Sequence, residues 1–149
     1  MTPREAWCNH AANVLVGASG VVYGWMLYLV ESTDDFAIAN HPWQPFVHSL
    51  HVATAPLLVF AIGLLWSRHA WGRVRGGFKV RRKTGLVLVT LAAPMIVSGY
   101  AIQVATSESI RQAGIYLHVA TSAVWLLAYA VHQVSSRTRD AKATARSAE

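Results

Sequence analysis

The sequence predicts an all-α integral membrane protein, a four-helix bundle with up-down-up-down topology. Of its 149 residues, 54% are hydrophobic and only 13% are charged. Four windows, 6–30, 36–66, 84–107 and 112–136, contain no Asp, Glu, Lys or Arg. Each window reaches the roughly 20 residues that a spanning helix needs, and none has the charged stripe of a soluble bundle. We therefore expect one transmembrane domain over 1–149, with helices at about 6–30, 42–68, 84–106 and 110–134.

The charges between these windows predict the orientation of the chain. All Lys and Arg residues except Arg111 lie before the first window, between the second and third, or after the fourth. The positive-inside rule then places both termini and the basic loop 68–83 in the cytoplasm. The net charge of +6 is thus explained by topology and by anionic lipid headgroups. No nucleic-acid partner is expected.

The first expected helix, 6–30, combines a histidine with regularly spaced glycines. His10 lies near its inner end, and His10, Gly17 and Gly24 recur every seven residues, so they share one face; Gly20 adds to the stripe. Glycines at such spacing allow close packing of helices. They would equally leave room for a flat cofactor, and the two interpretations are compatible.

The second expected helix, 42–68, begins at Pro42 and Trp43, residue types that suit a first helical turn and a membrane interface. It carries His48 and His51 near its outer end and His69 just beyond its inner end. A further histidine, in the preceding acidic loop, is expected at the surface.

The last two expected helices differ in their histidine content. The helix at 84–106 has none, and its Pro94, Ser98 and Gly99 are expected to bend it or let it pack closely. The helix at 110–134 carries His118 and His132. No internal repeat is expected, because the second and fourth helices share little besides an outer histidine. The polar tail 135–149 is expected to fray.

The spacing of His118 and His132 indicates the chemistry of the site. Fourteen residues of helix leave the two imidazoles about 40° apart in azimuth and roughly 21 Å apart along the axis. One ring thus lies near each edge of a hydrocarbon layer about 30 Å thick. Ionisable groups inside a membrane are expensive, and neutral imidazole is the usual nitrogen ligand of haem iron. The spacing predicts two haem groups stacked across the bilayer.

The outer haem needs a second ligand at the depth of His118, and the second helix offers two. His48 and His51 are three residues apart and roughly on one face, so only one can meet the iron. We favour His51 and keep His48 as the alternative.

The inner haem needs a partner for His132, and two histidines compete. His10 follows Arg4 by six residues and His132 precedes Arg137 by five, so their depths match. His69 shares a face with His51 but lies 18 residues away; this is a rise of about 27 Å rather than 21 Å. We favour His10 and keep His69 as the alternative.

Other uses of the histidines fit the pattern less well. They could form interhelical hydrogen bonds in a bundle without a cofactor. A non-haem metal site needs ligands about 2 Å from one ion, which rings roughly 21 Å apart on one helix cannot supply. A proton-conducting chain finds no Asp or Glu inside any window.

These residues resemble a known family, the small four-helix bacterial membrane di-haem cytochromes b. The group includes cytochrome b561-like proteins and the cytochrome b subunits of membrane-bound formate dehydrogenases and hydrogenases. The resemblance runs over about 7–134 and is carried by the histidine pair of the fourth helix and by segments 51–63, 98–100 and 117–121. It implies His51 with His118 on an outer haem b, and His10 with His132 on an inner one. Segment 66–69 resembles a recurring helix end in one subgroup, which retains His69 as a candidate.

The resemblance implies a respiratory-chain electron carrier with two non-covalent, bis-histidine haem b groups and no catalytic residue of its own. Its partners would be the quinone pool and a redox protein such as a periplasmic c-type cytochrome or an oxidoreductase subunit. One alternative is a stand-alone superoxide/quinone oxidoreductase, with His41, Trp43 and Gln44 available at the outer edge. The other is a cofactor-free membrane anchor or assembly bundle.

Overall fold

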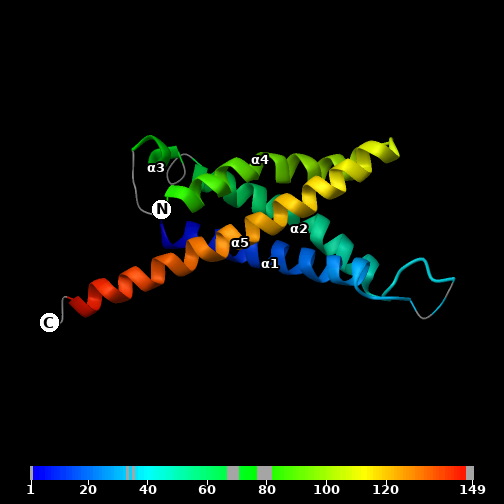
Figure 1. The fold of residues 1–149 in the computed structure, drawn as a ribbon, viewed down its shortest axis with the longest axis horizontal. Helices are drawn as coiled ribbons and strands as arrows, with labels where there is room; N and C mark the ends of the chain where they lie inside the picture. The colour runs from blue at the N-terminus through cyan, green and yellow to red at the C-terminus, as the bar shows by residue number, and fades with distance from the viewer. Residues whose placement is uncertain (1, 33, 35, 67–70, 77–81, 147–149) are drawn as a thin grey trace. The chain divides into compact units, whose positions relative to one another are not determined.

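The computed structural model describes residues 2–32, 34, 36–66, 71–76 and 82–146 (Figure 1). They form five helices and, among these residues, no strand: α1 (Pro3–Tyr28), α2 (Gln44–Leu65), α3 (Gly72–Arg75), α4 (Arg82–Val104) and α5 (Glu108–Arg146). Four stretches are long and apolar enough to cross a membrane: Pro3–Tyr28, Gln44–Leu65, Lys83–Val104 and Glu108–Ser135. The all-α prediction with four candidate spans is confirmed.

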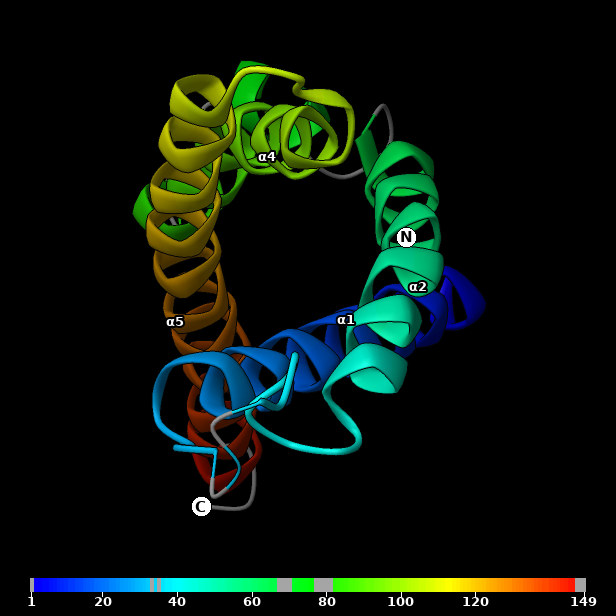
Figure 2. The same ribbon diagram turned by 90° about the vertical axis from the view of Figure 1, so that its right-hand side faces the viewer.

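The chain divides into two compact units, Met1–His69 and Ala70–Glu149. In the first unit, α2 returns alongside α1 after the long connection visible in Figure 2. A capping box starts α1: the Thr2 hydroxyl accepts the backbone N–H of Glu5, and the Glu5 carboxylate accepts the N–H of Thr2. This cap satisfies two N–H groups that the helix leaves open. The helix therefore begins before residue 6, where the charge-free window begins.

The second unit pairs α4 with α5 across a short connection (Figure 2). Here α5 runs to Arg146, past the expected end at 134. The expected fraying of the tail 135–149 stays a prediction. Alanine, lysine and arginine in 135–146 have high helix propensity, so the helix continues where the apolar window stops.

Each unit has a thin core between its two long helices. The buried apolar residues are Ala12, Val16, Met26, Val47, Leu58 and Ala61 in the first unit, and Ala92, Met95 and Trp125 in the second. The apolar windows of the four spans are only 11–28% buried, and large residues such as Leu29 and Leu127 are exposed. Apolar surface of this extent suits lipid contact, so the chain is compatible with a multi-pass membrane protein.

Candidate functional site

In the first unit, α1 holds the imidazole of His51 by two hydrogen-bonding groups. The ring Nδ1 lies 3.1 Å from the main-chain oxygen of Val16 and 3.3 Å from Oγ of Ser19. The Ser19 hydroxyl itself donates to the Val16 oxygen at 3.1 Å. Because a carbonyl oxygen can only accept, Nδ1 of His51 carries the proton. A neutral imidazole in this tautomer has its lone pair on Nε2.

A glycine makes this approach of ring and helix possible. A Cβ atom built at Gly20 would lie 2.8 Å from Cε1 of His51, well inside van der Waals contact. Any larger residue would have to push the imidazole away from α1. The absence of a side chain at residue 20 thus permits the ring to lie this close to α1.

In the second unit, α4 holds His118 in the same way. Its Nδ1 lies 3.0 Å from the main-chain oxygen of Met95 and 3.4 Å from Oγ of Ser98. The Ser98 hydroxyl donates to the Met95 oxygen at 3.1 Å, and a Cβ at Gly99 would lie 3.0 Å from Cε1 of His118. The carbonyl again requires the proton on Nδ1, so the neutral ring has its lone pair on Nε2.

The two arrangements also match beyond the rings. Thr54 donates its hydroxyl to the main-chain oxygens of Leu50 and His51, and Thr121 does so to those of Leu117 and His118. In sequence, Leu-His-Val-Ala-Thr occurs at 50–54 and again at 117–121, and Ser-Gly occurs at 19–20 and 98–99. We call this set the histidine module: a carbonyl, the serine and the glycine on one helix, and the histidine and threonine on the next. The expectation of no internal repeat is wrong.

The repeat is hard to find in the sequence because the number of residues between the serine and the histidine differs between the two units. Serine and histidine are 32 residues apart in the first unit and 20 apart in the second. Sequence reasoning therefore missed Ser19 and Ser98 as neighbours of the ligand candidates and missed the role of Gly20. The signal that the sequence offered for the repeat was the recurrence of Leu-His-Val-Ala-Thr and of Ser-Gly.

His132 also contacts α4, nearer the start of that helix. Its Nδ1 lies 2.9 Å from Oγ1 of Thr84, and a Cβ at Gly85 would meet its Cε1 at 3.8 Å, an ordinary contact. Since a hydroxyl both donates and accepts, either tautomer satisfies this bond. His118 and His132 both face α4, in agreement with the shared face that their spacing predicts.

The remaining histidines have other surroundings. The His48 ring packs against Tyr23 with centroids 4.9 Å apart. The His10 and Trp7 rings are nearly perpendicular, with centroids 6.3 Å apart. His41 lies in the connection before α2 and accepts the backbone N–H of Trp43 at 3.1 Å. His69 lies outside the described residues. The pairs His51–His118 and His10–His132 each draw on both units and stay predictions.

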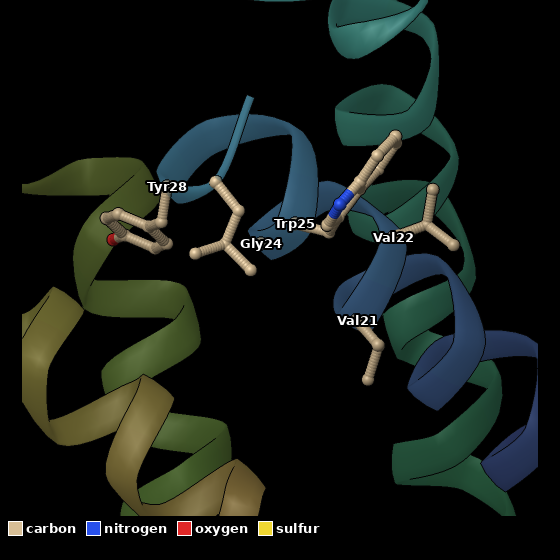
Figure 3. A pocket seen from close by; sticks show the side chains of 6 residues that line it. Val21, Val22, Gly24, Trp25 and Tyr28 are labelled. Atoms are coloured by element: carbon tan, nitrogen blue, oxygen red, sulfur yellow. The ribbon is translucent and has the colours of Figure 1, made fainter. Parts of the chain in front are cut away.

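The glycines expected to share a face with His10 have different surroundings. A Cβ at Gly24 would meet nothing within 4 Å, so Gly24 does not serve helix packing within its unit. It borders an open apolar hollow on α1 with Val21, Val22, Trp25 and Tyr28 (Figure 3). Gly17 is half-buried. The close contact of the first unit belongs to Gly20 instead.

Among the described residues, no group of three His, Cys, Asp or Glu side chains lies close enough to hold one metal ion. Comparison with protein-family models, curated proteins and solved structures finds no match for this chain. The candidate site therefore rests on the chain's own residues, and its strongest feature is the histidine module that occurs once in each unit.

Proposed function

We propose that the chain is a transmembrane di-haem b-type cytochrome of a bacterial inner membrane, with both termini in the cytoplasm. It would carry single electrons between the quinone pool and a redox partner such as a periplasmic c-type cytochrome or an oxidoreductase subunit. One observation carries the proposal: His51 and His118 both place Nδ1 against a main-chain carbonyl. Histidines that ligate metals usually donate their other ring N–H to a carbonyl or carboxylate.

The residues present fit a haem at the outer level. His51 and His118 would hold the iron through Nε2, the nitrogen that their tautomer leaves as the basic one. At the inner level the ligands would be His132 and His10, with His69 as the alternative to His10. Haem held by two histidines supplies one-electron transfer.

The chain's own residues would orient and shield these ligands. The carbonyls of Val16 and Met95 fix the rotation of each ring about its Cβ–Cγ bond. Gly20 and Gly99 allow each ring to lie against the neighbouring helix. The surrounding apolar segments keep water away, and this strengthens the hydrogen bonds that orient the rings.

The same hydrogen bonds favour one other candidate function, a cofactor-free anchor or assembly bundle. His51 ties α2 to α1, and His118 ties α5 to α4. Interhelical hydrogen bonds in membranes contribute about 0.6 kcal/mol on average and up to about 1.7 kcal/mol. A structural role alone would explain the bonds.

A spectrum of the purified protein distinguishes the two functions. We expect the bands of b-type haem in the reduced-minus-oxidised difference spectrum. Pyridine haemochrome quantitation should give two haem groups per chain. Protein that is folded and helical but lacks these bands after expression with sufficient haem would refute the cytochrome and favour the anchor.

A further inference from the structure

Two buried serines contact the imidazoles of the histidine module although their own hydrogen bonding does not require it. Ser19 is 6% exposed and Ser98 is 3% exposed. A serine inside a helix normally satisfies its hydroxyl on a carbonyl three or four residues earlier, as both do here. The oxygen of each hydroxyl nevertheless lies 3.3–3.4 Å from Nδ1 of a histidine on the other helix.

The tautomer of each histidine defines the role of its serine. Since Nδ1 is the donor, the hydroxyl proton goes to the carbonyl and the hydroxyl oxygen accepts from Nδ1. Each ring N–H is thus shared between a carbonyl, at 3.1 Å for His51 and 3.0 Å for His118, and a more distant hydroxyl. The geometry makes the serine the second, weaker acceptor in both units.

We propose that Ser19 and Ser98 are matched positioning residues, each of which tunes the reduction potential of the haem that its own histidine would bind. This inference rests on the proposed function. An acceptor on Nδ1–H increases electron density at Nε2 and makes the imidazole a stronger donor to the metal. A stronger donor stabilises ferric over ferrous iron, so each serine lowers the potential.

The test is a redox titration of the full-length purified protein and its serine variants. Ser19→Ala and Ser98→Ala should each raise the midpoint potential of the same haem. We expect the ferrous-to-ferric ratio at a fixed ambient potential to rise about threefold, or about 28 mV, given 59 mV per tenfold for one electron. The double variant should shift by about twice as much.

The control comes from outside the module. Ser135→Ala removes the hydroxyl of a helical serine that, like Ser19 and Ser98, donates to a carbonyl of its own helix. It should leave the potential of the outer haem unchanged. Ser19→Thr and Ser98→Thr keep the hydroxyl and should retain the wild-type potential.

The outcomes distinguish failure of the cytochrome proposal from failure of the proposed serine role. Wild-type protein without haem overturns the cytochrome and this inference together. Wild-type protein with haem, but alanine variants with unchanged potentials, overturns the serine role alone. Shifts on two different haems overturn the pairing of His51 with His118 on one iron. Loss of haem in the alanine variants but not in the threonine variants supports positioning of the ligand; loss in both sets overturns it and assigns the serines to packing.

Discussion

At the scale of single residues, the glycines of the histidine module make the sharpest prediction. Gly20→Ala and Gly99→Ala place a Cβ at 2.8 Å and 3.0 Å from the imidazole Cε1 atoms. The ring of His51 must therefore shift, whereas the ring of His118 must give by only a few tenths of an ångström. We expect Gly20→Ala to lose most of the outer haem and Gly99→Ala to lose less of it. Haem content per chain, measured by pyridine haemochrome, checks this.

The control for this substitution is Gly63→Ala on α2, where a Cβ meets nothing within 4 Å. Alanine there should keep both haems and gain up to about 1 kcal/mol of helix propensity. Equal haem loss at Gly63 would mean that the loss comes from replacing any helical glycine rather than from contact with the ring.

The ligands themselves give the second prediction. His51→Ala and His118→Ala should each lose one haem, and the same one, because each would remove an axial nitrogen of a single iron. His48→Ala should keep both, since its ring packs on Tyr23. Difference spectra at fixed potentials identify which haem is lost. Retention of two haems in either of the first two variants contradicts the outer pair, and loss in His48→Ala would transfer the ligand to that residue.

At the scale of elements, the charge-free windows located the four long helices but not their ends. The windows mark where lipid can lie, whereas helix ends depend on caps and propensity. Hence α1 begins at Pro3 behind its capping box and α5 continues to Arg146. The histidine ligand candidates could be predicted from their spacing along each helix, which can be counted in a single sequence. The roles of Ser19 and Gly20 could not be predicted in this way, because they depend on which part of α1 faces His51 on another helix.

The placement of two histidines on α5 leads to the third prediction, for the inner haem. His132→Ala and His10→Ala should each remove the inner haem and leave the outer one, whereas His69→Ala should keep both. The physical reason is depth: His10 and His132 lie at similar distances from the basic ends of their segments. Quantitation of haem with redox titration checks the three variants. Loss in His69→Ala with retention in His10→Ala would transfer the ligand to the second helix.

At the scale of the whole molecule, the chain contains two helical pairs with one histidine module each. An iron held by His51 and His118 would join the two units, whereas a structural hydrogen bond acts only within its own unit. The two cases therefore differ in the free energy of unfolding. A ligand that binds only the folded state stabilises it by an amount set by its affinity, about 4 kcal/mol at a thousand times its dissociation constant.

A double-mutant cycle on His51 and His118 therefore separates the cytochrome from the cofactor-free bundle. With haem, either alanine variant loses the whole haem-linked stabilisation, about 4 kcal/mol, together with a local hydrogen bond of about 0.6 kcal/mol. The double variant should then cost only about 0.6 kcal/mol more than either single one. In a cofactor-free bundle both singles would be small and would add, because the bonds lie in separate units.

The measurement is the free energy of unfolding in detergent for the wild type, the two single variants and the double variant. The same four proteins expressed under haem depletion provide the control and should show small, additive effects. Large but additive losses in the haem-loaded set would mean that the two histidines act on different partners. That result would exclude a shared iron even if the protein binds haem elsewhere.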